Sequence, residues 1–254
     1  MKNKEKMTKY RFFNNNTGPI KENEIKAFQK ALSICNSEKD VDSIILLIHT
    51  KNNTGYIERI FDTRNIKKLF SGIKIDPNYP PIRIETLKTF NDNHQSKYVV
   101  VTFGLRSEEI YKYEDFESVI GIVAHQWVEP DVKNWAKTYG AIDIDTNQEI
   151  EKTKKPGLVI QKAFQDLTNA INMSTGIVQS DDNNRCKTYI RALKKYDYDL
   201  NSQEIFSFLT AELNWDSDNA NDVIKLIDKV NSGGYFQGGE KTGLKYYIKR
   251  WKEE

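Results

Sequence analysis

Three short apolar runs, rich in β-branched residues, constrain the fold of this chain more than any other feature. They are Ser43–Ile48, Tyr98–Phe103 and Val119–Ala124. Apolar side chains at consecutive positions are typical of strands that are buried on both faces, as in a parallel sheet covered by helices. Segments with apolar residues at helical spacing separate these runs. The alternation therefore predicts an α/β fold with a small, mainly parallel sheet, although it leaves the strand order open.

The second half of the chain carries a different pattern. After a polar stretch at 145–157, strand-like runs end, and apolar residues recur every three or four positions. This pattern predicts a compact bundle of about five short helices. Within the first 20 residues, Tyr10–Phe13 could pair as a short edge strand. We predict a loose segment at 1–20, an α/β domain at 21–146, a linker at 147–157 and a helical domain at 158–254.

Composition narrows the class of protein. Hydrophobic residues make up 38% of the chain and charged residues 29%, which favours a packed core over disorder. No apolar run approaches the roughly 20 residues that span a bilayer, and the start of the chain has no apolar secretory signal. We therefore expect a cytoplasmic protein without a membrane partner. The abundance of Lys, Asn and Ile is typical of AT-rich bacterial genomes.

Charge is spread unevenly along the chain. The formal net charge is only +2, with a basic excess over residues 1–100 and an acidic excess over 101–150. Proteins that bind nucleic acids usually concentrate basic residues on one face. The distribution here does not favour a nucleic-acid partner.

Polar side chains follow each of the three predicted strands. Ligands of open α/β sheets bind outside the carboxyl ends of the strands, so these residues are the candidate site. Cations, imidazoles and a Trp ring suit an anionic, phosphorylated small molecule. The alternative is that these residues are polar because strand ends meet water, with the Trp packed on a helix. The candidates are His49, Lys51, Asn52, Arg106, His125, Gln126 and Trp127.

Sequence motifs for known cofactors are absent, and no cofactor is predicted. The turn after the first strand has a single glycine, Gly55, where a dinucleotide fingerprint needs three. The segment Gly234–Thr242 departs from a Walker A loop, because Glu240 precedes Lys241 where phosphate would sit and the segment before it has a helical pattern. A loop between helices is the favoured interpretation, with phosphate binding as the alternative. Asp143 and Asp145 share one side of a short strand and could hold Mg²⁺ with a third acid, but a solvated strand end is the simpler interpretation. No metal site is predicted.

Both cysteines, Cys35 and Cys186, occupy apolar positions of predicted helices. Two such thiols form neither a disulfide framework nor a thiolate zinc site. A reactive thiol needs a polar and exposed setting, so a catalytic cysteine is not expected.

The helical half contains three segments with a family resemblance. They are Tyr189–Leu193, Asn214–Asp216 before a helix, and Lys229–Gly233 at a helix end. This part, roughly 185–250, resembles the YoaC-like family of small helical bacterial proteins of unestablished function. The resemblance implies a helical fold and supplies no catalytic residue. The chain departs from that family in its Gly233–Gly239 loop and in the α/β part that precedes the helices.

Aromatic and basic residues alternate near the end of the chain. Tyr235, Phe236, Tyr246 and Arg250 are candidates for a surface that contacts a protein partner. Stacking on nucleic-acid bases and a plain core with a solvated face are the alternatives.

Two hypotheses about function remain open. The first is a non-catalytic interaction or regulatory protein, favoured by the lack of a catalytic motif. The second is a receptor or enzyme for an anionic small molecule at the strand ends, and it depends on the strand order.

Overall fold

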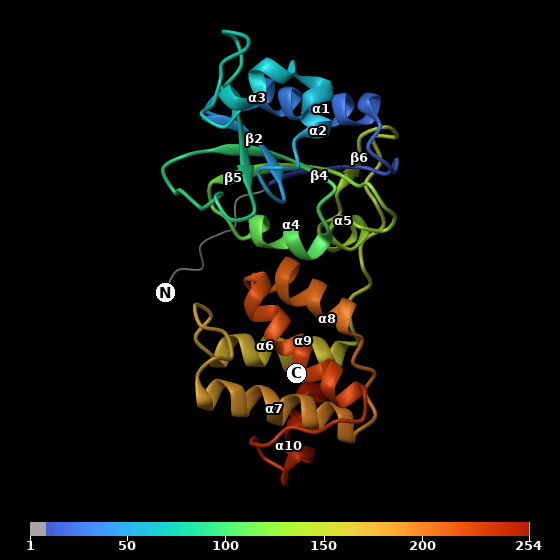
Figure 1. Ribbon diagram of the computed structural model, residues 1–254. Helices are drawn as coiled ribbons and strands as arrows, with labels where there is room; N and C mark the ends of the chain where they lie inside the picture. The colour runs from blue at the N-terminus through green and yellow to red at the C-terminus, as the bar shows by residue number, and fades with distance from the viewer. Residues whose placement is uncertain (1–8, 254) are drawn as a thin grey trace. The chain divides into compact units, whose positions relative to one another are not determined.

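The computed structural model describes residues 9–253 (Figure 1). The chain divides into two compact units, Met1–Lys152 and Thr153–Glu254. The first eight residues, which belong to the segment predicted to be loose, lie outside the described residues.

The first unit is built on one six-stranded sheet in the order β3-β2-β4-β5-β1-β6. All neighbouring strands are parallel. The strands are β1 (Tyr10–Asn14), β2 (Ser43–Ile48), β3 (Ile82–Thr86), β4 (Tyr98–Phe103), β5 (Val119–His125) and β6 (Ile142–Asp143). The predicted α/β class with a parallel sheet is confirmed. The three apolar runs form β2, β4 and β5, the adjacent strands at the centre of the sheet.

Strand β1 differs from the expectation. The segment lies between β5 and β6, inside the sheet and not at its edge. Phe12 and Phe13 point to opposite faces, and both are buried. The local sequence of this short run does not reveal its central position, because the neighbours of a strand in a sheet are set by contacts between residues distant in sequence.

Helices cover both faces of the sheet, as Figure 1 shows. On one face lie α1 (Lys21–Ser37), α2 (Gly55–Ile60) and α3 (Thr63–Leu69), and on the other α4 (Ser107–Glu114) and α5 (Lys133–Tyr139). The direction of the crossovers explains this division. The chain moves one way along the sheet through α1 to α3 and the opposite way through α4 and α5. Right-handed crossovers in opposite directions place their helices on opposite faces.

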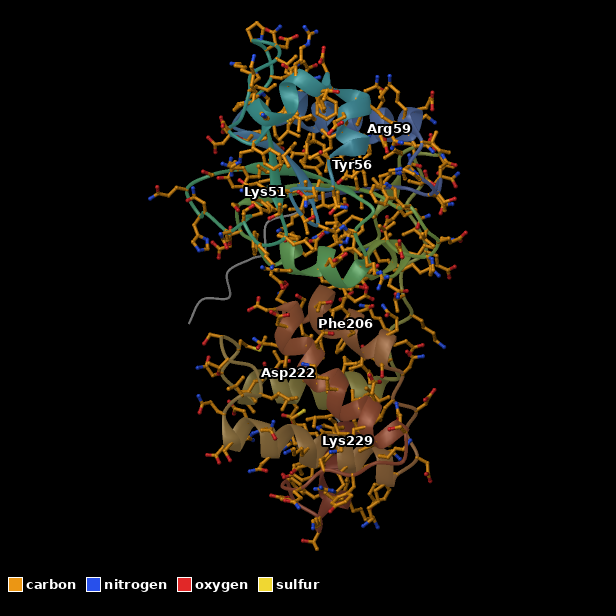
Figure 2. The ribbon with its side chains drawn as sticks, viewed as in Figure 1. Lys51, Tyr56, Arg59, Phe206, Asp222 and Lys229 are labelled. Atoms are coloured by element: carbon orange, nitrogen blue, oxygen red, sulfur yellow. The ribbon has the colours of Figure 1, made fainter. Side chains whose placement is uncertain are left out.

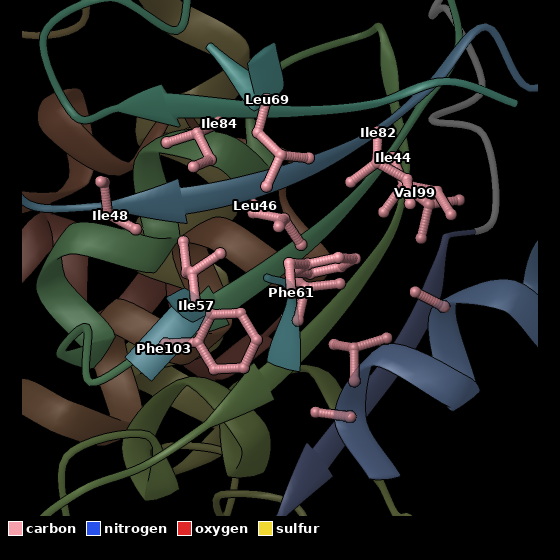
Figure 3. Packing of buried hydrophobic residues seen from close by; sticks show 14 of the residues in the cluster. Ile44, Leu46, Ile48, Ile57, Phe61, Leu69, Ile82, Ile84, Val99 and Phe103 are labelled. Atoms are coloured by element: carbon pink, nitrogen blue, oxygen red, sulfur yellow. The ribbon is translucent and has the colours of Figure 1, made fainter. Parts of the chain in front are cut away.

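A large hydrophobic cluster lies between the sheet and α1 to α3 (Figure 3). Ile44, Leu46 and Ile48 of β2 contribute alternate side chains, and so do Val99, Val101 and Phe103 of β4. Alternation along each strand sends the intervening residues to the face covered by α4 and α5. Ile45, Leu47 and Val100 are wholly buried there too, which explains the continuous apolar runs.

The second unit is helical. Its elements are α6 (Leu158–Ala170), α7 (Ser180–Lys195), α8 (Ser202–Ser207), a π-helical turn (Phe208–Glu212), α9 (Ser217–Asn231) and α10 (Leu244–Glu253). Their apolar faces bury Phe164, Ile190, Trp215 and Trp251. The indole nitrogen of Trp251 donates to Asp166 at 3.1 Å, so the polar edge of this core ring is satisfied.

The segment expected to link the two parts begins later than predicted. Residues 147–150 turn back on β6, where Asp143 N donates to Gln148 O and Ile150 N donates to Ala141 O, both at 2.9 Å. The start of the predicted linker, 147–157, therefore belongs to the first unit. Asn147 permits the turn because it adopts a left-handed conformation with φ of 56°.

Candidate functional site

The strand order creates a switch point between β2 and β4. From β2 the chain crosses to β3, on one side, and from β4 it crosses to β5, on the other. The loops that leave these two adjacent strands therefore diverge at the carboxyl edge. Open α/β sheets bind ligands at such switch points. Lys51 lies in the loop that follows β2, and Arg106 follows β4.

The register of the sheet decides which candidates share a face. Ile48, Phe103 and His125 end their strands in one row, so His49, Gly104 and Gln126 form the next row. Successive side chains of a strand point to opposite faces. Phe103 packs in the cluster beside α1, and the His125 ring meets it at 6.4 Å. His49 points the other way, toward α4, and the two histidines do not converge.

Glu109 joins the two diverging loops. His49 Nε2 lies 3.2 Å from the Glu109 carboxylate, and the backbone nitrogen of Arg106 donates to Glu109 Oε2 at 2.8 Å. Both side chains of the His49–Glu109 pair are partly exposed. The carboxylate fixes the orientation of the ring through Nε2. The structure thus brings His49 and Arg106 together through a residue that was not among the candidates.

Lys51 and Asn52 lie in an exposed turn between β2 and α2 (Figure 2). The turn is closed by Asn53 N, which donates to Thr50 O at 2.9 Å, and by a hydroxyl contact from Thr50 to Asn53 at 2.6 Å. Neither Lys51 nor Arg106 forms an ion pair within 4 Å among residues 9–253, and both residues are exposed.

His125 is a buried structural residue. Its Nε2 lies 3.0 Å from the Gly18 carbonyl oxygen, and its side chain has no exposed surface. Burial lowers the pKa of His125, which keeps the imidazole neutral so that it can donate to Gly18. We remove His125 from the ligand-contacting candidates because solvent does not reach it.

Gln126 and Trp127 are also packing residues. Gln126 is buried and donates to the Asn15 carbonyl oxygen at 2.9 Å. The Trp127 ring meets Tyr56 of α2 edge-on at 4.8 Å and covers Gly104 so closely that a Cβ there would lie 2.3 Å from it. The ring therefore matches the alternative drawn from the sequence, in which Trp127 packs on a neighbouring helix.

A second group of polar residues at this edge escaped the sequence analysis. Glu24 of α1 has no exposed surface, and its Oε1 accepts from the Arg59 guanidinium at 2.5 Å. Burial raises the pKa of Glu24. The Tyr56 hydroxyl is buried beside it, and burial, with the nearby Glu24 charge, raises the pKa of Tyr56. The sequence does carry a signal for this group, because Glu24 is an acidic residue on an otherwise apolar face of the predicted helix.

The two aspartates considered for metal binding are engaged elsewhere. Asp145 accepts from Lys26 and from the Asn16 amide, at 2.6 and 2.5 Å. Asp143 lines a cavity of about 370 Å³ at the ends of β1 and β6, together with Asn15, Lys133 and Lys137. This mixed-charge hollow lies away from the β2–β4 switch point.

The four candidates near the chain end do not form one surface. Tyr235 and Tyr246 are largely exposed. Phe236 is buried under the guanidinium of Arg191, which lies 5.1 Å from the ring centre. Arg250 is paired with Asp166 inside the unit. Two of the four therefore remain available to a partner.

Fold and site together define a class: an open parallel α/β unit with a topological switch point between β2 and β4, followed by a helical unit. A family described as a domain of unknown function (DUF1889) matches residues 157–252, which are nearly the whole helical unit. No curated protein and no solved structure matches the chain. None of the helices among the described residues is long and apolar enough to cross a membrane.

Proposed function

We propose that the first unit binds an anionic, phosphorylated small molecule at the β2–β4 switch point. The observation that carries the proposal is the strand order. It makes β2 and β4 neighbours, so the loops that bear Lys51 and Arg106 start side by side at the carboxyl edge and then diverge. The sequence favoured an interaction role because it lacks a catalytic motif and leaves the strand order open.

Charge supports an anionic ligand. Lys51 offers an exposed ammonium group, and Arg106 offers a planar guanidinium that can bind two phosphate oxygens at once. The Glu109 charge is offset by His49 and by the backbone N–H of Arg106, so it opposes a bound anion less than a free carboxylate would.

His49 gives this site the means for proton transfer. A carboxylate that orients a partly exposed imidazole through one ring nitrogen is the arrangement of a positioned general acid or base. Binding alone makes the unit a receptor, and proton transfer to the bound molecule makes it an enzyme. The variant His49→Ala distinguishes the two, since it should abolish turnover in an enzyme while leaving most of the affinity.

The test is a thermal-shift and calorimetric screen with inorganic phosphate, nucleotides and sugar phosphates on the full chain. A ligand at about 100 times its Kd adds about 2.7 kcal/mol to the stability of the folded state. We expect Lys51→Ala with Arg106→Ala to abolish the shift. The control is Lys39→Ala with Lys74→Ala, two exposed lysines that precede strands β2 and β3 and so lie at the opposite, amino edge.

Two results would overturn the proposal. One is the absence of any shift across the screen at millimolar concentrations. The other is a shift that both double variants retain, because it would place the ligand elsewhere. Product analysis after incubation with a ligand then separates receptor from enzyme.

A second candidate is a non-catalytic interaction or regulatory role through the helical unit, the part that resembles the YoaC-like family. It is favoured by the exposed rings of Tyr235 and Tyr246, 73% and 63% accessible, since exposed tyrosines are common anchors of protein interfaces. A binding partner whose affinity is unchanged by Tyr246→Ala and Tyr235→Ala would count against this role.

A further inference from the structure

The helical unit contains a cavity of about 400 Å³ between the end of α7, the end of α9 and the glycine-rich loop that follows α9. We call it the α7–α9 pocket. Its lining residues are Arg191, Lys194, Lys195, Val230, Gly233, Gly234, Tyr235, Phe236 and Lys241. The volume lies within the range of small-molecule sites.

The lining of the pocket is cationic. It has four basic residues and no carboxylate. Lys194 donates to the neutral Asn231 amide oxygen at 3.2 Å, and in the described chain none of the three lysines has a carboxylate within 4 Å. Lysines in the last turn of a helix commonly offset its dipole, which accounts for Lys194 and Lys195 but not for Lys241, which lies outside any helix.

The loop that forms one wall is held in place. Arg191 donates to three of its carbonyl oxygens, those of Phe236, Gly238 and Glu240, at 3.2, 3.0 and 2.6 Å. The Phe236 ring packs beneath the guanidinium. Gly234 lies so close to the end of α9 that a Cβ would be 2.8 Å from the Lys229 carbonyl oxygen. The wall is therefore preorganised, which lowers the entropic cost of binding.

Beside the lysines stands a flat apolar surface. The Tyr235 ring lines the pocket and is 73% exposed. An exposed aromatic ring next to a set of cations can stack on a planar heterocycle while the cations bind phosphate. A volume of about 400 Å³ suits one small molecule better than an extended peptide.

We propose that the α7–α9 pocket binds a small molecule that joins a phosphate group to a flat aromatic ring, the chemistry of a nucleotide. Lys194, Lys195 and Lys241 bind the phosphate groups and Tyr235 stacks on the ring. This site is separate from the switch-point site of the first unit and does not depend on it.

The experiment is isothermal titration of the full chain with ATP, AMP, adenosine and inorganic pyrophosphate. We expect ATP to bind more tightly than pyrophosphate or adenosine, because only ATP engages both the lysines and the ring. Lys194→Glu with Lys241→Glu should weaken ATP at least tenfold, and Tyr235→Ala should weaken ATP but not pyrophosphate.

Matched controls on α10 separate this site from general charge effects. Lys245→Glu with Lys252→Glu makes the same charge change at exposed positions outside the pocket, and Tyr246→Ala removes an exposed ring elsewhere. Lys51→Ala with Arg106→Ala removes the switch-point cations, so binding that survives it belongs to the helical unit. Both α10 control variants should bind ATP as the unmodified protein does.

The proposal is overturned if none of the four compounds binds at millimolar concentration, or if the pocket variants and the α10 controls lose affinity equally. A single-stranded oligonucleotide serves as a competitor of ATP. If it competes, and if the same pocket variants weaken its binding, the phosphate-and-ring chemistry is supported and the ligand is a nucleic-acid strand. Failure of the oligonucleotide to compete supports a free nucleotide.

Discussion

Glu24 is wholly buried at the start of α1, and its carboxylate is held by the half-exposed guanidinium of Arg59 on α2 at 2.5 Å. The two residues belong to helices that lie side by side on one face of the sheet (Figure 2). The second carboxylate oxygen of Glu24 is buried without a hydrogen-bond partner among the described residues. Arg59 is thus the group that makes this buried acid tolerable.

Replacing Arg59 should therefore destabilise the first unit. We expect Arg59→Ala to lower the free energy of unfolding by about 1–3 kcal/mol, because it leaves a buried carboxyl group without its charged partner. Urea denaturation measures the loss. The matched control is Arg64→Ala, since the Arg64–Asp62 pair is exposed and should leave the midpoint unchanged. Equal losses for both variants would contradict the role given to Arg59.

Burial of His125 should make stability depend on pH. The pKa of His125 is lowered in the folded chain, so the unfolded chain binds more protons as the pH falls below about 6.5. The stabilisation is present above that pH and is lost as the pH falls toward the lower, folded-state pKa. Denaturation between pH 7.5 and 5 should show this slope. His125→Gln should flatten it, whereas the same change at exposed His94 should not.

Gly104 should resist substitution. Its φ of +65° is unfavourable for other residues, and a Cβ would lie 2.3 Å from the Trp127 ring. We expect Gly104→Ala to cost about 2 kcal/mol or more, since it adds backbone strain to a clash with a packed side chain. Gly55→Ala is the control, because nothing lies within 4 Å of its Cβ position. Thermal unfolding should show that the two variants shift the Tm in opposite directions, or by amounts that differ by several degrees.

Glu109 should stabilise the first turn of α4 in addition to orienting His49. Glu109→Ala removes the acceptor for the Arg106 N–H, and we expect a loss of about 1 kcal/mol in unfolding free energy. Glu108→Ala, one position earlier on the same helix and exposed, should cost less. Chemical denaturation compares the two. If Glu109→Ala proves no worse than Glu108→Ala, the loop-joining role of Glu109 is wrong.

The two thiols should be inert in the folded chain. Burial raises the pKa of Cys35 to about 11 and that of Cys186 to about 12, so neither forms a thiolate at neutral pH. A chromogenic disulfide reagent should report almost no reaction until urea unfolds the protein, and two equivalents afterwards. Rapid release of one equivalent from the folded protein would show that one helix opens readily.

The sequence by itself determined the fold class. The apolar runs that became β2, β4 and β5 could be satisfied only by burial on both faces, and the helical spacing after 158 left no room for further strands. Local patterns of this kind predict structure directly, because the spacing at which side chains share one face follows from the geometry of the helix or strand backbone. The buried states of Cys35 and Cys186 followed in the same way.

Only the tertiary structure decided the site. Strand order and register are set by contacts between residues far apart in sequence, and a shift of one residue turns a side chain to the other face. That parity sends His49 toward Glu109 and His125 toward Gly18, although both histidines follow similar apolar runs. The same long-range packing placed β1 inside the sheet and put Arg191 against the loop that lines the α7–α9 pocket.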